Sequence, residues 1–352
     1  PKVSRPCAGN MNHTINIPGV ISHDELALTA ESIARLQLPS GMIPWNAGGH
    51  CDPWNHVETA MALDTLGLHH EARRAYEWLA DVQRSDGSWH NYYHSDGSVK
   101  EAKLDTNVCA YMAAGLWHHW LCTGDKKTLH SLWPTAKAAL QWVLSMRRSD
   151  GTILWAKEVD ESPWDYALLT GSCSIRHSLR CGAMVAALLD DHADVYLRAA
   201  DIIDDIVRTA LHAFEPKERF AMDWYYPILT GAKESVQAKD RLAMFYDTFV
   251  MEGLGVRCVS DEPWVTAAET AECSLSYAAI GDLDTAKKLL LWTRPHRTSE
   301  GSYLTGIVHP QLISFPEDEC TAYTGAAIIL AADAIAGTSP GARLFMHDGF
   351  SD

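Results

Sequence analysis

Apolar residues recur along most of this chain at the spacing of amphipathic helices. After Asp52-Pro53, for example, Val57, Ala60 and Met61 lead into an apolar run, and proline suits the first turn of a helix. No clear run of strands interrupts the pattern. It predicts about twelve helices, near residues 22–37, 53–66, 68–84, 105–123, 126–146, 172–190, 194–214, 222–232 (a shorter piece), 236–250, 263–280, 282–293 and 320–336.

The predicted helices are of two alternating kinds. Segments 68–84, 126–146, 194–214 and 282–293 are charged, whereas the helices that follow are richer in Ala, Gly and Cys, which suits helices crowded around an axis. Three charged segments end in related turns at Gly87, Gly151 and Gly301, and Gln37 to Gly41 resembles a fourth. We expect each glycine to take the left-handed conformation that ends a helix. Outer helix, loop and inner helix, repeated six times, predict an all-α (α/α)6 barrel of one domain, residues 1–352; an unclosed superhelical array of hairpins is the alternative.

In this topology all six outer-to-inner loops emerge on one rim, and each is rich in aromatic, histidine and carboxylate side chains. A rigid scaffold that presents such loops is where function is expected. Aromatic faces interleaved with hydrogen-bonding groups suit sugar rings, although each aromatic residue could instead plug the barrel. In chain order the loops carry Trp45, His50, Asp52 and Trp54; Trp89, His90, Tyr92, Tyr93 and Asp105; Trp155, Lys157, Glu158, Trp164 and Asp165; Asp223, Trp224, Tyr225 and Tyr226; Arg257, Asp261, Glu262 and Trp264; and Tyr303, His309, Glu317, Asp318 and Glu319.

Composition narrows the function further. The 352 residues carry 29 basic and 45 acidic side chains, a formal net charge of −16, which disfavours binding to nucleic acid or anionic membrane surfaces. Tryptophan (13) exceeds phenylalanine (7), as expected for a surface that grips amphipathic ligands. The nine cysteines show no Cys-x-x-Cys spacing, and the N-terminal residues lack a signal-peptide core. We therefore expect reduced thiols and a cytoplasmic protein.

Hydrolysis of a glycosidic bond needs two carboxyl groups, one protonated and one ionised. Asp52 and Glu262 are the leading pair, because both directly precede a Pro-Trp dipeptide at the expected start of an inner helix. Simple N-capping is the alternative for Asp52, Asp105 and Asp261. Glu58 and Glu269 lie within apolar helices, where they are either functional acids or partners of Arg180 or Arg257.

Other chemistries lack their motifs. His50, Asp52 and His56 cluster without metal-ligand spacing, Gly171-Ser172-Cys173 is not a nucleophile elbow, and Gly48-Gly49 is not followed by the residues of a phosphate-binding loop. His118-His119 is expected to pack in the core. We predict no metal and no cofactor.

Two resemblances extend this interpretation. The segment from Ala75 to Trp89, with Gln83-Arg84-Ser85-Asp86-Gly87-Ser88-Trp89, resembles the repeat of terpenoid cyclases and protein prenyltransferases. That motif stabilises helix junctions and supports only the fold. Neither the Asp-x-Asp-Asp motif nor the zinc residues of those families are evident, and Asp282-Leu283-Asp284 falls on the opposite rim.

Over nearly the whole chain, a second set of motifs resembles an actinobacterial family of (α/α)6 proteins that includes mycobacterial methylmannose polysaccharide hydrolases. The resemblance implies an intracellular endo-α-mannosidase acting on a partly O-methylated, α-(1→4)-linked mannan. It also singles out Ala47, in a rim turn where a carboxylate would face the cleft. The motifs are Pro44-Trp45, Gly48 to Glu58, Asp105-Thr106-Asn107, Asp223 to Pro227 and Glu252 to Cys258.

The prediction is therefore an inverting endo-glycoside hydrolase in which Glu262 protonates the departing oxygen and Asp52, or an acid lost at position 47, activates water. Two alternatives remain: an epimerase using His50, His177 or His309, and a non-catalytic glycan-binding protein; a terpenoid cyclase or prenyltransferase is a more distant third. The residues expected to contact sugar are Trp45, Ala47, His50, Trp54, Trp89, Tyr92, Tyr93, Asp105, Asp223, Trp224, Tyr225, Arg257, Asp261, Trp264 and Glu269.

Overall fold

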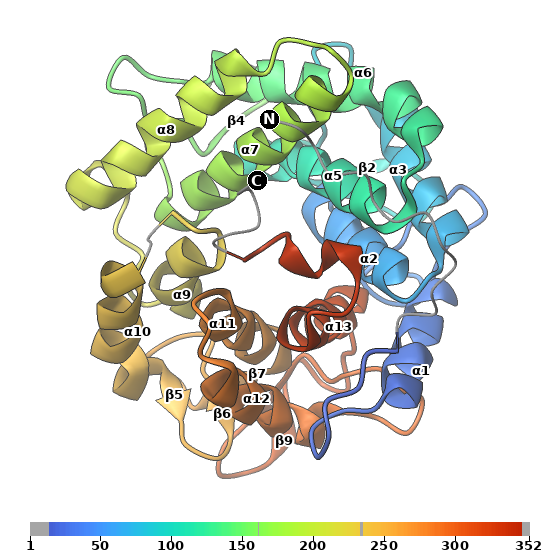
Figure 1. The fold of residues 1–352 in the computed structure, drawn as a ribbon, viewed down its shortest axis with the longest axis vertical. Coiled ribbons are helices and arrows are strands. Elements are labelled where there is room, and N and C mark those ends of the chain that lie inside the picture. Colours follow the sequence, from blue (N-terminus) through green and yellow to red (C-terminus); the bar gives the residue numbers. More distant parts are fainter. Residues whose placement is uncertain (1–13, 161, 233–234, 347–352) are drawn as a thin grey trace.

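The helices form two concentric rings in the computed structural model, which describes residues 14–160, 162–232 and 235–346 (Figure 1). The outer ring consists of α1 (His23–Ala34), α3 (His69–Val82), α6 (Lys126–Ser145), α8 (Asp194–Thr209), α10 (Ser235–Phe249) and α12 (Leu283–Trp292). The inner ring consists of α2 (Pro53–Thr65), α4 (Thr106–Ala110) with α5 (Met112–Thr123), α7 (Leu169–Leu188), α9 (Ala221–Leu229), α11 (Ala267–Ala279) and α13 (Ala322–Ala336). Each inner helix packs on the next and α13 packs on α2. The closed (α/α)6 barrel is confirmed and the unclosed array is excluded.

Small residues let the inner helices approach one another closely. A Cβ atom added to Gly115 of α5 would lie 2.6 Å from Val57 Cγ1 of α2 and 2.7 Å from the Tyr76 ring of α3. Inner helices such as α13 are buried along almost their whole length, whereas outer helices such as α8 bury one face. The alanine-rich and charged segments of the sequence therefore correspond to the two rings.

The structure contains the repeated turns that the sequence predicts, but their glycines do not cap helices. Helix α3 ends at Val82, and Gln83 is already extended; Gly87 closes the next turn, with its N–H donated to Arg84 O. The Gln83 amide donates to Gly87 O and to Thr135 O of α6, both at 2.9 Å. Gln37 makes the equivalent bonds to Gly41 O (2.9 Å) and Glu71 O of α3 (2.8 Å). The turn therefore attaches one hairpin to the next outer helix.

The six long loops join into one continuous ring, which we call the mouth: residues 35–52, 83–105, 146–168, 210–220, 250–266 and 293–321. Neighbouring loops pair through their backbones at Cys51–Tyr93, Leu104–Lys157, Ala167–Phe214, Phe220–Val259 and Trp264–Val308. The N–H of Ala322 donates to Trp45 O and closes the ring at 2.7 Å. The expectation that all six loops share one rim is confirmed.

Short strands in the mouth correct the strand-free prediction. They are β1 (Tyr92–Tyr93), β2 (Val99–Glu101), β3 (Leu104–Asp105), β4 (Ala156–Lys157), β5 (Val250–Met251), β6 (Gly255–Val256), β7 (Trp264–Thr266), β8 (Gly306–Val308) and β9 (Ile313–Ser314). All pair antiparallel, and β7–β8–β9 form the largest sheet. The predicted helix near 263–280 begins only at Ala267, because β7 pairs with β8. Helix 105–123 is interrupted at Tyr111, and 194–214 ends at Thr209 with a 3₁₀ turn, η1 (Leu211–Ala213), after it.

The opposite end of the barrel is closed by the C-terminal part of the described chain. The 3₁₀ turn η3 (Pro340–Arg343) packs on α5 and α13, and it lies over the barrel axis in Figure 1. The Phe345 ring stacks on His177 with centroids 5.1 Å apart.

The cysteines of the described residues are free thiols. Residues 1–13, on which the N-terminal prediction rests, lie outside the described residues. In the part that is described, every helix is too short or too polar to cross a bilayer.

Candidate active site

Asp52 lies at the junction between the first mouth loop and α2, buried beneath the loops. One carboxylate oxygen accepts the N–H of Asn55 (2.9 Å), so the predicted N-cap exists, and the other accepts the indole N–H of Trp45 (2.8 Å). Burial raises the pKa of Asp52 to about 6, against the lowering effect of these bonds, and the charge of Asp105 raises it further. The carboxyl group is therefore poised to exchange a proton near neutral pH.

Asp105 repeats this arrangement one loop further on. Its carboxylate accepts the N–H of Val108 (3.1 Å), capping α4, and the indole N–H of Trp155 (2.5 Å). Burial also raises the pKa of Asp105. Trp155 belongs to the third loop, so this bond joins two loops at the side of an acid. The two aspartates interact electrostatically, which identifies them as one acidic cluster.

An aromatic corner surrounds Asp52. The ring centroids of Trp45 and His50 lie 4.4 Å apart, and Tyr92 makes edge contacts with both. Lys100 donates to His50 Nδ1 at 2.9 Å, and burial together with the Lys100 charge lowers the His50 pKa. These half-buried rings lie beside Asp52, in the loop region where we predict that aromatic residues contact sugar. Ala47 lies at the exposed tip of the same loop.

A second aromatic cluster stands in the third loop. Trp155 stacks on Tyr166 with centroids 5.6 Å apart and meets the edge of Trp164. The ammonium of Lys103 lies 4.3 Å from the Trp155 ring centroid, a cation–π contact. Since Trp155 also donates to Asp105, this aromatic cluster lies beside an acid.

The fifth loop places Glu262 at the surface of the mouth. Glu262 and Asp261 are exposed, and Asp261 pairs with Arg219 at 2.9 Å instead of capping a helix. Trp264, on β7, is half-buried and donates its indole N–H to Phe315 O of the sixth loop (2.9 Å). The expectation that Glu262 directly precedes an inner helix is wrong, because β7 separates them.

Glu269 occupies the first turn of α11, partly buried below the fifth loop. Its hydrogen bond and charge, added to burial, raise the pKa of the Cys258 thiol. Arg257 donates to Thr248 O, and Arg180 lies 3.8 Å from Asp204. Among the described residues, the ion pairs observed include none between either arginine and Glu269 or Glu58.

A buried acidic layer crosses the barrel below the mouth. Tyr111 donates to Glu58, and Tyr225 and Tyr323 both donate to Glu272. Burial raises the pKa of Glu58 to about 7 and, with the charge of Glu58, that of Glu272 to about 8. At neutral pH Glu272 is therefore largely protonated, whereas Glu58 is about half protonated. Trp54 is buried at the top of this layer, stacked on Tyr111 (4.6 Å).

Five aromatic residues expected to contact sugar are buried in the core, namely Trp54, Trp89, Tyr93, Trp224 and Tyr225. Trp89 is fully buried and donates its indole N–H to Leu79 O (2.8 Å). Tyr93 packs on Trp78, and its hydroxyl accepts the N–H of His90. Tyr225 belongs to α9 and serves the acidic layer. These placements correct the prediction, since an enclosed ring cannot stack on substrate.

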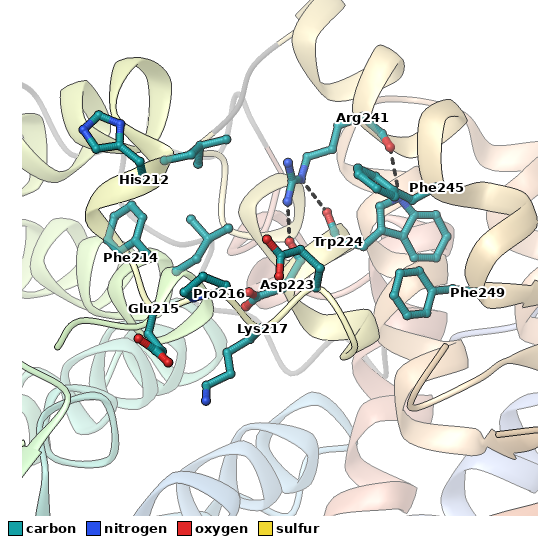
Figure 2. Close-up of a pocket in the computed structure, with 13 residues that line it drawn as sticks. His212, Phe214, Glu215, Pro216, Lys217, Asp223, Trp224, Arg241, Phe245 and Phe249 are labelled. Carbon is teal, nitrogen blue, oxygen red and sulfur yellow. Dashed lines mark hydrogen bonds between the residues drawn. The ribbon is translucent and has the colours of Figure 1, made fainter. Parts of the chain in front are cut away.

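Asp223 and Trp224 also belong to helix α9, not to a loop. Unlike Tyr225, they border a pocket that the fourth loop also lines (Figure 2). Asp223 accepts the hydroxyl hydrogen bond of Thr170 at 2.6 Å.

Comparison with known proteins finds a relative of this chain in sequence and several solved structures with the same fold. The chain is 42% identical over 329 residues to the MMP endo-(1,4)-3-O-methyl-alpha-D-mannosidase of Mycolicibacterium hassiacum, covering 94% of this chain and 91% of that protein. It belongs to the family of that glycoside hydrolase. No protein-family model matches the chain.

Solved glycosidases share the fold of this glycoside hydrolase. A wild-type glycosidase superposes with a TM-score of 0.72 at 14% identity, covering 90% of this chain and 97% of the other. The GH63 mannosylglycerate hydrolase of Thermus thermophilus, in complex with glucose, superposes with a TM-score of 0.65 at 10% identity, covering 88% of this chain and 99% of the other.

Of the three histidines considered for an epimerase, His50 and His309 lie in mouth loops of this glycoside hydrolase, whereas His177 does not. His177 is buried on α7 against Phe345 at the closed end of the barrel. His56 does not join His50 and Asp52, because its ring nitrogens bond Ile43 N and Ala75 O. Family membership favours hydrolysis over the epimerase, glycan-carrier and cyclase alternatives.

Sequence reasoning missed Glu272 of this glycoside hydrolase. It lies one helical turn after Glu269 on an apolar helix, which is the signal that could have identified it. His119 was expected in the core, and it lies there with Nδ1 2.9 Å from Asp64, a partner that was not foreseen.

Proposed function

We propose that this chain cleaves internal α-(1→4) bonds of a 3-O-methylated mannan with inversion of configuration. The M. hassiacum relative is named for this bond and this sugar. A mouth lined by half-buried aromatic rings suits sugar rings whose hydroxyls are partly methylated, because methyl groups add apolar surface. The observation that carries the proposal is the buried Asp52 carboxyl beside Trp45, with a pKa of about 6.

Asp52 is the proposed general base. With a pKa of about 6 it is mostly ionised at pH 7, yet far more basic than an ordinary aspartate, so it can take a proton from water. The bonds from Trp45 and Asn55 fix both its oxygens and hold the group in one orientation.

Glu262 is the proposed general acid, which protonates the departing oxygen. Its exposed position on the fifth loop lets it meet a chain lying across the mouth. Inversion requires about 6.5–9.5 Å between the two carboxyl groups, to leave room for the attacking water.

The first experiment incubates the protein with 3-O-methylmannose oligosaccharides and follows the products by mass spectrometry and proton NMR. Shortened oligosaccharides whose new reducing ends first appear as the β-anomer are expected, because the attack inverts an α-linkage. An initial α-anomer would overturn inversion, and no shortened product would overturn hydrolysis.

The second experiment separates the two acids. D52N and E262Q are each expected to lower kcat by about 10²–10⁴-fold, the usual contribution of general acid–base catalysis. With an activated fluoride leaving group, which needs no protonation, E262Q should recover and D52N should not. Glu300→Gln, at an exposed turn, is the matched control. Recovery of D52N alone would reverse the assignment, and wild-type activity of either variant would remove that residue from the mechanism.

A further inference from the structure

The pocket in Figure 2 is lined by neither Asp52 nor Asp105. It has a volume of about 490 Å³, within the range of small-molecule sites, about 300–1,000 Å³. Its walls come from η1, residues 214–218 of the fourth loop, the first turn of α9, and α10. The fourth loop, residues 210–220, is the shortest of the six mouth loops. Because residues of the fourth loop line it, the pocket adjoins the mouth on this side.

Apolar side chains form most of the wall. Phe214 is buried, Phe245 is half-buried and Leu211 is exposed at the edge. Trp224 stacks on Phe249 with centroids 5.5 Å apart and an interplanar angle of 12°, so the far wall is fixed. Phe245 and Leu211 are the apolar residues that present surface to a partly apolar ligand, and the buried rings support them from behind.

A few anchored polar groups interrupt this surface. Arg241 donates to Trp224 O (2.9 Å) and Asp223 O (2.6 Å), and Figure 2 shows its guanidinium directed at these carbonyls. Thr170 fixes the Asp223 carboxyl, whose pKa is raised by burial. Glu215 and Lys217 lie at the edge of the pocket, so charges of both signs are present. A pocket without an excess of cations does not select an anion such as phosphate.

We propose that this pocket binds an O-methylated hexose unit of the polymer at a distance from the bond that is cleaved. Methyl groups would pack on Phe245 and Leu211, while hydroxyls bond to the Asp223 carboxyl. The inference rests on the proposed function and adds a second point of attachment, which only oligosaccharides long enough to span both sites can use. Attachment at two points raises affinity through effective concentration.

The test compares kcat/KM for two 3-O-methylmannose oligosaccharides. One has about four units, to occupy the cleavage site alone, and the other has about twelve units, to reach the pocket as well. In the wild type the longer chain should be the better substrate. Phe245→Ala should lower the long-to-short ratio about tenfold through KM, because it removes an apolar platform. Leu211→Asp, at an exposed position that tolerates a polar residue, should lower the same ratio and guards against misfolding of the first variant. Met244→Ala is the matched control, since Met244 neighbours Phe245 on α10 but is 71% exposed and absent from the pocket.

The outcomes separate the two proposals. If wild-type protein cleaves neither oligosaccharide, the proposed function fails. If it cleaves both, but the Phe245 and Leu211 variants keep the wild-type ratio, or if Met244→Ala lowers the ratio equally, the pocket is not a binding site for the substrate.

Discussion

Trp45 and Trp155 make the same kind of hydrogen bond to two neighbouring acids. Each indole N–H donates to an aspartate that also caps an inner helix, Asp52 in one case and Asp105 in the other. A hydrogen bond to a carboxylate favours its charged form, whereas burial opposes it. The balance leaves both acids with raised pKa values, and one indole N–H contributes to it at each acid.

Removal of the donor should therefore move the pH dependence of catalysis. In Trp45→Phe the ionised form of Asp52 loses a partner, so its pKa rises above about 6. A base acts only when ionised, and the acidic limb of the kcat/KM profile should shift to higher pH. Trp155→Phe, which removes the equivalent bond from Asp105, is the control and should shift this limb less. An unshifted profile for Trp45→Phe would contradict the role of Asp52 as base.

Single residues were predicted well where local sequence defines their place. Asp52 was found because a carboxylate before Pro-Trp marks a helix start at a loop. Trp89 was misplaced, because sequence does not show whether a loop aromatic turns toward solvent or the core. Glu272 was missed because its partners, Tyr225 and Tyr323, come from two other helices and only the closed ring brings them together.

At the scale of elements, the turns that follow the outer helices act as connectors between hairpins. Gly87 has a φ of +93°, and a Cβ atom there would lie 2.5 Å from Ala138 O of α6. Gly41 and Gly301 meet the backbones of α3 and α1 in the same way. These glycines are required by close approach as well as by backbone conformation.

Gly87→Ala should therefore destabilise the protein more than a matched glycine substitution. Gly97, in the hairpin of β1 and β2, has a similar φ of +84° but no atom within 4 Å of the added Cβ. Backbone strain alone predicts a loss of about 1–2 kcal/mol for Gly97→Ala, and overpacking adds about 1–3 kcal/mol at Gly87. Urea unfolding measures both, and equal losses would show that the contact with α6 does not matter.

Helices were predictable from the sequence, whereas the strands were not. A helix such as α6 repeats its apolar spacing over several turns. Strands of two or three residues, such as β3 and β4, show no period at all, because they exist only through pairing between loops distant in the sequence. Pairing of the same kind, between β7 and β8, places the start of α11 at Ala267.

For the whole molecule, the acidic layer across the barrel makes stability dependent on pH. Glu272 has a pKa of about 8 in the folded protein, above its ordinary value of 4.5. The unfolded chain therefore loses this proton first, and stability falls as pH rises from about 4.5 toward 8, after which both states are ionised.

Glu272→Gln should flatten this dependence. The variant stays neutral and keeps an oxygen to accept a tyrosine hydroxyl, so its stability relative to wild type should rise between pH 5 and pH 8. Each pKa unit of difference corresponds to about 1.4 kcal/mol. Thermal unfolding across this range measures the effect, with Glu31→Gln, on the exposed face of α1, as control. Parallel curves for Glu272→Gln and wild type would show that this proton does not couple to folding.

Closure of the barrel behind the acidic layer also decides how a polymer can move. In the described chain, η3 and Phe345 block the axis, so the barrel is a blind cup rather than a tunnel. A polysaccharide cannot be threaded through it. Under the proposed function, both halves of a cut chain must depart from the side on which the chain arrived.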